Sequence, residues 1–389
     1  MAAGMYPYFR AIERHDCTKA QVGGREVVMV GSNNYLGLTH DPRVTTAARE
    51  AADRYGTSCT GSRFLNGTIE LHEELERRLA KFMKMEATAV FSTGFHVNLG
   101  TLSSLAGKGD VVLCDRENHA SIIDGCRLSF GETKKFRHGD LDDMERLLQS
   151  CPPNSGKLIV VDGVFSMNGT ITNLPQVLEV AQRYDARVMV DDAHGIGCLG
   201  AHGRGTIEHW GLIGKPGVDL VMGTFSKSLA SLGGFIAGPA DVVHYIKHNA
   251  RSLIFSASAT PSSTAAAMAA LEIIEQEPWR IQRLHAIVER VRTAFNEMGY
   301  DTMGSETPIV PVLIGGEEET FKFWKMLDDR GIFANPVVPP GTPPGKGLIR
   351  TSYMATHSDE EIDRVIEVFA EIAALRGQLS RVDASANSE

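Results

Sequence analysis

The chain has 389 residues, of which 43% are hydrophobic and 22% are charged, and its formal net charge is −9. This composition is typical of a soluble globular protein, and the length suits a large domain with a smaller one, or a single elaborated α/β unit. The negative charge and the absence of any basic run exclude an electrostatic basis for binding nucleic acid. We expect no transmembrane segment and no signal peptide, because no apolar stretch is long enough and the N-terminus lacks the required pattern.

The spacing of the cysteines and histidines predicts neither a disulfide framework nor a metal site. The six cysteines include no CxxC pair, and the thirteen histidines include no HExxH motif. In a chain of this length, such cysteines are typical of reduced thiols rather than of a disulfide or zinc framework. We therefore expect a cytoplasmic protein that binds no metal.

The order of elements along the chain predicts an α/β protein. An N-terminal segment (1–40) contains an extended stretch at 25–37, and a helical stretch follows at 41–56. Helical periodicity also marks 141–149, 174–184 and a long region at 262–298. The apolar runs that predict strands lie at 87–92, 110–115, 157–166, 186–194, 218–223 and 233–238.

Nearly continuous apolar strands separated by helices indicate a mostly parallel sheet that is covered on both faces. We expect a large domain at 41–265 to contain this sheet. A smaller α+β domain would span 266–376, and the small polar residues of 377–389 predict a disordered tail.

Two glycine-rich motifs suggest nucleotide binding but fail on context. GIGCLG (195–200) matches GxGxxG, yet more loop follows it where a dinucleotide site requires a helix. GTPPGKG (341–347) has only three residues between its first two glycines and no Ser or Thr after Lys346, so it is not a P-loop.

Chemically useful residues follow the predicted strands. In parallel sheets, ligands bind beyond the carboxyl ends of the strands, so these residues would meet at one edge. A glycine at the start of a helix lets backbone N–H groups converge on an anion, here a phosphate. The residues that end these strands are Gly94, His119, Asp191, Asp192, His194, Thr224, Ser226 and Lys227.

This set predicts a site for pyridoxal 5′-phosphate (PLP). Lys227 would form a Schiff base with the cofactor aldehyde, and an adjacent carboxylate would keep the ring nitrogen protonated. The face of an imidazole can stack on the ring, while hydroxyl and N–H groups hold the phosphate. Each residue alone has a commoner structural role, such as a cap, a turn or an exposed lysine, so the prediction depends on the set.

From about residue 5 to residue 375 the sequence resembles the α-oxoamine synthase family of fold-type I PLP enzymes. The resemblance implies a mostly parallel seven-stranded sheet in the large domain. The matching stretches are NNYLG (33–37), GSRFLNGT (61–68), STGF (92–95), NHASIIDG (118–125), VDDAHGIGCLGAHGRG (190–205), GTFSKSLASLGGF (223–235), IFSAS (254–258) and LIRTSYMATH (348–357).

The resemblance also implies a role for each site residue. Lys227 would bind the cofactor covalently and act as base and acid at the substrate α-carbon, and His119 would stack on the ring. Asp191 would pair with the ring nitrogen and His194 with the ring hydroxyl. The implied phosphate ligands are Gly94, Phe95, Thr224 and Ser226, together with Ser256 from the partner subunit of a homodimer with shared active sites; Asn34 and Arg350 would bind the amino-acid carboxylate.

GTFSKSLASLGGF and GSRFLNGT are most similar to the family members that use L-serine. These members condense it with a long-chain acyl thioester of the palmitoyl-CoA type, lose carbon dioxide and form 3-oxosphinganine, the first step of sphingolipid biosynthesis. The donor, a coenzyme A or a carrier-protein thioester, stays open, as does peripheral contact with a membrane.

Other functions stay open at this point. Gly195 follows His194 as in 8-amino-7-oxononanoate synthases, whereas the serine-using members usually have serine there. Glycine C-acetyltransferases and cysteate-using sulfonolipid synthases are further relatives. A fold-type I aminotransferase would share the cofactor site, and a binding module without a cofactor would share only the fold.

Overall fold

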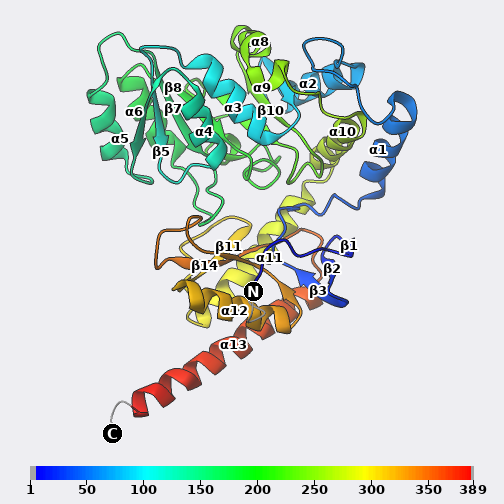
Figure 1. The fold of residues 1–389 in the computed structure, drawn as a ribbon, viewed down its shortest axis with the longest axis vertical. Coiled ribbons are helices and arrows are strands. Elements are labelled where there is room, and N and C mark those ends of the chain that lie inside the picture. The colour runs from blue at the N-terminus through cyan, green and yellow to red at the C-terminus, as the bar shows by residue number, and fades with distance from the viewer. Residues whose placement is uncertain (1–5, 387–389) are drawn as a thin grey trace. The chain divides into compact units, whose positions relative to one another are not determined.

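The computed structural model describes residues 6–386, and the chain divides into two compact units (Figure 1). The larger unit comprises residues 38–166 and 171–281. The smaller unit comprises residues 1–37, 167–170 and 282–389, so the N-terminal segment groups with the C-terminal part of the chain.

The larger unit contains a seven-stranded sheet in the order β4-β10-β9-β8-β7-β5-β6. Strand β10 is antiparallel to both of its neighbours, and all other adjacent pairs are parallel. The mostly parallel seven-stranded sheet expected from the sequence is therefore confirmed. The strands are β4 (Ala87–Phe91), β5 (Val111–Asp115), β6 (Glu132–Phe136), β7 (Lys157–Asp162), β8 (Arg187–Asp191), β9 (Leu220–Thr224) and β10 (Gly234–Gly238).

Helices cover this sheet (Figure 1), and β5, β9 and β10 are buried along their whole length. Burying one large aliphatic side chain stabilises a fold by about 1.5–3 kcal/mol, so these apolar runs provide much of the unit's stability. The helices of the larger unit are α1 (Pro42–Tyr55), α2 (Glu70–Met83), α3 (Gly94–Leu105), α4 (Ala120–Leu128), α5 (Leu141–Gln149), α6 (Leu174–Arg183), α7 (Thr206–His209), α8 (Ala240–Asn249), α9 (Arg251–Ile254) and α10 (Pro261–Gln276).

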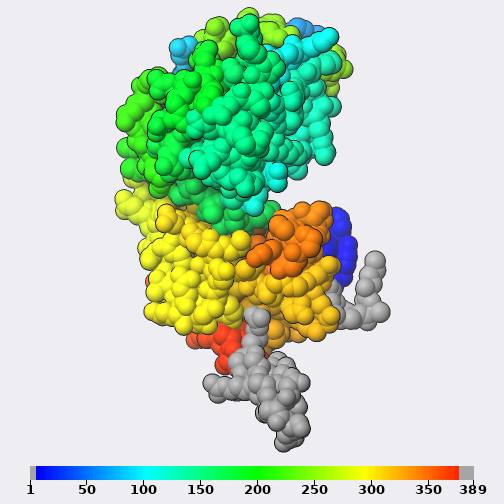
Figure 2. All heavy atoms as spheres, turned by 90° about the vertical axis from the view of Figure 1, so that its left-hand side faces the viewer, coloured from blue at the N-terminus to red at the C-terminus, as the bar shows by residue number. Residues whose placement is uncertain are grey.

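Helices α5 and α6 lie where the sequence periodicity predicts them, on the side of the larger unit that faces the viewer in Figure 2. Each begins at a side-chain cap: Asp140 accepts a hydrogen bond from the backbone of Asp143, and Asn173 accepts one from that of Gln176. Such caps satisfy backbone N–H groups that have no partner within the helix.

Three local features differ from the sequence expectation. The strand predicted at 157–166 ends at Asp162, because the chain bends at Gly163 and Val164 then forms an isolated antiparallel bridge with Ile171. Strand β6 was not predicted, since ETKKF is a charged edge strand without apolar alternation. The helical region at 262–298 is two helices, α10 and α11 (Trp279–Glu297), separated at Pro278, which has no N–H to donate.

The smaller unit has two sheets, in the orders β1-β2-β3-β12 and β11-β14-β13. Helix α13 includes residues 377–386, for which the composition predicts a disordered tail, and residues 387–389 lie outside the described residues. The elements are β1 (Arg14–Asp16), β2 (Lys19–Val22), β3 (Arg25–Met29), β11 (Ile309–Gly315), β12 (Ile332–Phe333), β13 (Asn335–Val337), β14 (Gly347–Ser352), α11, α12 (Glu317–Asp329) and α13 (Asp359–Ala386).

Across the described part of the chain, no helix combines the length and the apolar character that a membrane crossing requires. Within the same residues, no group of three or more His, Cys, Asp or Glu side chains is arranged to hold a metal ion.

Candidate active site

A cavity of about 260 Å³ in the larger unit gathers most of the residues that the strand ends predicted. Its walls come from the carboxyl ends of the parallel strands and the loops that follow them, where ligands bind in α/β sheets. Those of the predicted residues that line it are Gly94, Phe95, His119, Asp191, His194, Thr224, Ser226 and Lys227.

One wall of the cavity is the N-terminus of helix α3. Thr93 caps this helix by accepting a hydrogen bond from the His96 N–H, and Gly94 is the first helical residue. A β-carbon at position 94 would lie 2.6 Å from the Thr224 hydroxyl oxygen, so only glycine fits there. The free N–H groups of the first turn, with the Thr224 and Ser226 hydroxyls 3.0 Å apart, suit a phosphate group.

Lys227 follows β9 in a tight turn and is half-buried. The Ala230 N–H donates to the Lys227 carbonyl, and the Ser231 N–H donates to the Phe225 carbonyl, so the backbone of this turn is fixed. Phe225 is fully buried and anchors the turn to the core. The lysine amine therefore extends from a rigid support into the cavity.

Asp191 and Asp192 are neighbours at the end of β8 but have different surroundings. Asp191 lines the cavity and accepts hydrogen bonds from the Asn98 amide at 2.6 Å and the Ala193 N–H at 3.1 Å. Asp192 does not line the cavity, because its carboxyl accepts from both the backbone and the hydroxyl of Thr206. Burial raises the pKa of Asp192 to about 7, whereas Asp191 can face a ligand.

His119 is the N-cap residue of α4 and lines the cavity. Its backbone N–H donates a hydrogen bond to the Asp162 carboxylate at 3.1 Å. This bond fixes the position of the backbone from which the imidazole ring extends. Exclusion of water lowers the pKa of the imidazole; the charge of Asp191 opposes this effect, and the charge of Lys227 adds to it. These surroundings favour a neutral ring.

Asp162 is a cavity residue that the sequence pattern did not reveal. The residue is 3% exposed, and one of its carboxyl oxygens, Oδ1, has no hydrogen-bond partner. Burial, followed by the charge of Asp191, raises its pKa well above the usual value. The sequence signal was available: Asp162 ends the apolar run KLIVVD, but the strand was predicted to continue beyond it.

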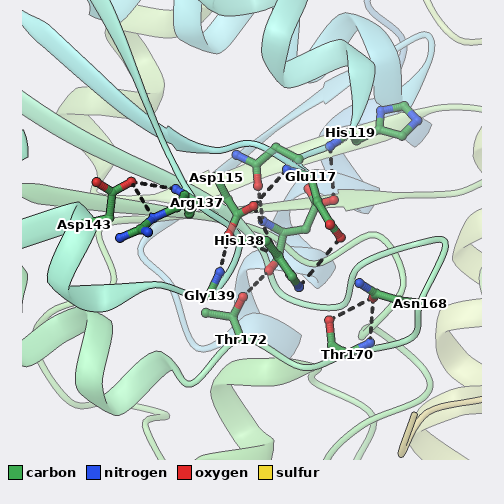
Figure 3. A network of polar contacts seen from close by, with 12 residues as sticks. Asp115, Glu117, His119, Arg137, His138, Gly139, Asp143, Asn168, Thr170 and Thr172 are labelled. Carbon is green, nitrogen blue, oxygen red and sulfur yellow. Dashed lines mark hydrogen bonds and ion pairs between the residues drawn. The ribbon is translucent and has the colours of Figure 1, made fainter. Parts of the chain in front are cut away.

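A second polar network supports the loop between β5 and α4, which contains His119 (Figure 3). The buried Asp115 carboxylate accepts hydrogen bonds from the Glu117 and Gly139 N–H groups and lies 3.2 Å from His138 Nδ1. Burial lowers the pKa of His138, but the hydrogen bond to Asp115 and the charges of Asp115 and Glu117 together outweigh this effect and raise the pKa overall. The Asp115 carboxylate therefore fixes the start of the loop that contains His119.

Three predicted site residues lie elsewhere in the chain. Ser256 is in the loop after α9 and does not line the cavity of its own larger unit. Asn34 and Arg350 belong to the smaller unit, where both are buried. Arg350 donates a hydrogen bond of 2.9 Å to Asn33, the neighbour of the residue that was predicted.

The cavity residues fit PLP. Gly94 packs against Thr224 and leaves an anion site at the N-terminus of α3. The side chains of Lys227, Asp191 and His119 line the same cavity. Together these groups match the phosphate, the aldehyde, the ring nitrogen and the flat face of the cofactor. The fold and this donor set define a fold-type I PLP-dependent transferase.

Comparison with known proteins agrees with the geometry. Residues 25–369 match the model of the family described as aminotransferase class I and II. The chain is 52% identical to the serine palmitoyltransferase of Sphingobacterium spiritivorum over 364 residues, which cover 94% of this chain and 91% of that protein. It is 44% identical to the 8-amino-7-oxononanoate synthase 1 of Bacillus velezensis, with coverages of 94% and 93%.

A solved serine palmitoyltransferase structure with PLP bound as an internal aldimine has a TM-score of 0.92 and 36% sequence identity. The match covers 95% of this chain and 94% of that one. The chain therefore belongs to the aminotransferase class I and II family and, within it, to the α-oxoamine synthases. Its cofactor is PLP.

Proposed function

We propose that this protein condenses L-serine with a long-chain acyl thioester of the palmitoyl-CoA type, with loss of carbon dioxide, to form 3-oxosphinganine. The main support for the proposal is that Lys227, Asp191 and His119 line one cavity in a chain that is 52% identical to a serine palmitoyltransferase. This reaction would begin sphingolipid biosynthesis.

Bound PLP supplies an electron sink that weakens the bonds at the α-carbon of the amino acid. Lys227 would hold the cofactor covalently and would remove and return the proton at that α-carbon. Asp191 would keep a proton on the ring nitrogen, and His194 would donate to the ring hydroxyl. His119 would cover the ring face and help to position the amino-acid carboxylate.

The smaller unit would supply the groups that orient the amino acid. Arg350 has a planar guanidinium group that can bind a carboxylate through two parallel hydrogen bonds, and Asn34 can donate one more. Orientation matters because only a bond perpendicular to the cofactor ring overlaps the π system. After acylation the carboxylate has to turn into that direction before it can leave.

Gly195, the feature that favours 8-amino-7-oxononanoate synthase, has a packing role in this structure. A β-carbon at this position would lie 1.9 Å from Asp192 Oδ1 and 3.0 Å from the Thr206 hydroxyl oxygen. Gly195 does not line the cavity. The buried Asp192–Thr206 pair thus accounts for the glycine, which does not indicate a particular amino acid or acyl chain as substrate.

The active unit would be a homodimer in which Ser256 of each subunit reaches the phosphate of the partner. The position of Ser256 outside the cavity of its own larger unit supports this proposal. Dilution that separates the subunits should then release PLP, and a monomer with full activity would overturn the shared site. All six cysteines are free thiols, which supports a reducing compartment such as the cytoplasm.

A substrate panel tests the activity. With [1-¹³C]serine and palmitoyl-CoA, the enzyme should release labelled carbon dioxide and free coenzyme A in equal amounts. L-alanine with pimeloyl-CoA should react much more slowly. If that pair is preferred, the protein is an 8-amino-7-oxononanoate synthase, and transfer of the amino group to an oxo acid without thioester consumption would identify an aminotransferase.

Parallel reactions with glycine plus acetyl-CoA and with cysteate plus palmitoyl-CoA test for glycine C-acetyltransferase and for sulfonolipid synthase activity. The same panel with an acyl carrier protein as donor determines which thioester is used.

A further inference from the structure

A line of hydrogen bonds joins Asp191 to the His119 ring through two residues that have no assigned role. The Asn98 amide nitrogen lies 2.6 Å from Asp191 Oδ2 and 2.8 Å from the Ser121 hydroxyl oxygen. That oxygen lies 2.7 Å from His119 Nδ1. Asn98 is on α3 and Ser121 is on α4, and both residues are at most 1% exposed.

The surroundings fix the orientation of the Asn98 amide. A reversed amide would place its oxygen 2.6 Å from an oxygen of Asp191, and two acceptors at that distance repel each other. The amide nitrogen therefore faces both partners. Its two hydrogens are donated, one to Asp191 and one to Ser121.

The direction of the last hydrogen bond follows from this arrangement. The Ser121 hydroxyl accepts from Asn98, and its own single hydrogen has one acceptor among the described residues, His119 Nδ1. The Ser121 backbone N–H also points at Nδ1, at 3.3 Å. Two donors thus converge on Nδ1, so this nitrogen has to present its lone pair.

We propose that Asn98 and Ser121 are positioning residues that hold His119 as the neutral tautomer with its hydrogen on Nε2. A hydrogen on Nδ1 would face two donors, the Ser121 hydroxyl and the Ser121 backbone N–H. The buried hydrogen of the Ser121 hydroxyl would then lose its acceptor. Leaving a buried polar group without a partner costs about 1–3 kcal/mol. Nε2, on the side of the ring away from Ser121, then remains as an N–H donor.

This tautomer gives the cavity two properties at once. The ring face stays uncharged and suits stacking on an aromatic cofactor, and the Nε2–H group can donate to an anionic substrate group. The same line of hydrogen bonds sets the orientation of the Asp191 carboxylate. The charged groups around the ring are Asp191, Lys227 and Asp162, and the carboxyl of Asp162 accepts from the His119 backbone. The inference holds whichever amino acid the enzyme uses.

Nuclear magnetic resonance tests the proposal directly on the full-length, PLP-loaded protein. With [¹⁵N]histidine labelling, two-bond ¹H–¹⁵N spectra report which ring nitrogen is protonated, and comparison with His119→Gln identifies the His119 signals. At pH 7 we expect a pyridine-type shift for Nδ1 and a pyrrole-type shift for Nε2. A protonated Nδ1 in the wild-type protein would overturn the proposal without any further variant.

Two variants then test the side chains independently. Ser121→Ala and Asn98→Leu should each shift the tautomer ratio of His119 at least about fivefold toward Nδ1–H, the change expected from one hydrogen bond. Ser121→Thr, which keeps the hydroxyl, should restore the wild-type ratio. The control is Ser129→Ala: it removes a hydroxyl just after the C-terminus of α4 that donates to Cys126 rather than to the site.

Unchanged tautomer ratios in both folded variants would show that the backbone N–H alone fixes the ring, and would refute the role of the two side chains. Circular dichroism and thermal melting identify any variant that fails to fold, and the wild-type spectrum remains decisive in that case. No substrate is needed for these measurements, so a negative result in the serine assay does not affect them.

Discussion

Gly94 packs so closely against Thr224 that a β-carbon at position 94 would lie 2.6 Å from the Thr224 hydroxyl oxygen and 3.0 Å from its β-carbon. Gly94→Ala should therefore push the first turn of α3 away from β9 and widen the phosphate site. We expect the dissociation constant for PLP to rise at least about tenfold, since one lost charge-assisted hydrogen bond is worth about 1.5–3 kcal/mol.

Fluorescence titration of the apoprotein with PLP measures this effect. The matched control is Gly107→Ala, two residues beyond the C-terminal end of α3, where a β-carbon would meet only Asp110 Oδ2, at 3.4 Å. The control should bind PLP as the wild-type protein does. Unchanged affinity in Gly94→Ala would place the phosphate elsewhere.

Lys227 should be the lysine that binds the cofactor covalently. Borohydride reduction followed by peptide mass spectrometry should find the pyridoxyl group on Lys227 in the wild-type protein and on no lysine in Lys227→Ala. Turnover in this variant should fall by about 10²–10⁴-fold or more, as expected when a general base is removed. Lys215→Ala, at an exposed position in the same unit, should behave as wild type, and a label on another lysine would reject the assignment.

Arg350 should affect the substrate and not the cofactor. Arg350 is 5% exposed in the smaller unit, whereas every residue that lines the cavity belongs to the larger unit. Arg350→Ala should therefore keep the visible absorbance of bound PLP and lose at least about tenfold in kcat/KM for L-serine. Arg350→Lys keeps the charge but cannot bind a carboxylate through two parallel bonds, so only partial recovery is expected. Loss of PLP from Arg350→Ala would indicate a structural role.

Asp192 should make the stability of the fold depend on pH. Its pKa is about 7 in the folded protein and near 3.8 when the chain is unfolded, so the folded state binds the extra proton between these values. Wild-type stability should accordingly fall as pH rises from about 4 to 7, relative to Asp192→Asn, by at most about 1.4 kcal/mol per pH unit.

Urea denaturation at pH 5 and pH 7 measures the free energies of unfolding. Asp185→Asn, at an exposed position, should retain the wild-type pH dependence. If Asp192→Asn follows the wild-type curve in parallel, Asp192 is ionised throughout and the prediction is wrong.

Gly195→Ser tests whether this position selects the substrate. A serine here would collide with the carboxyl of Asp192, so we expect a lower melting temperature. The ratio of kcat/KM for L-serine to kcat/KM for L-alanine should change less than about threefold, because Gly195 does not line the cavity. A residue that contacted the substrate directly would change this ratio by about tenfold or more. A switch toward L-alanine and pimeloyl-CoA would show that Gly195 is a specificity residue.

Most of the larger unit could be predicted from the sequence, because its strands are apolar runs and its functional residues follow them directly. Lys227, Asp191 and His119 were placed at one sheet edge from this rule alone, and the cavity contains all three. The rule failed for Asp162. The apolar residues Val164 and Phe165 continue the hydrophobic run, although the chain already turns at Gly163.

Side-chain hydrogen bonds between helices could not be predicted. Asn98 and Ser121 lie inside ordinary helical stretches, and nothing in their local sequence indicates that α3 and α4 bring them together. Sequence also could not distinguish Asp191 from Asp192 on physical grounds. The difference comes from Thr206, fourteen residues later, which occupies both carboxyl oxygens of Asp192.

The place of β10 in the sheet affects how the protein is made. Among the strands that the structure describes, β4 pairs only with β10, and β10 also separates it from β9. Residues 87–91 therefore have no strand partner until residues 234–238 exist. At about 5–20 residues per second, a ribosome needs on the order of ten seconds to synthesise the intervening chain. During that time the apolar sequence ATAVF is an unpaired strand edge, open to pairing with other chains. The two halves of the phosphate site, at Gly94 and Thr224, meet only after this interval, so a nascent chain cannot gain stability from the cofactor while it is most prone to aggregate.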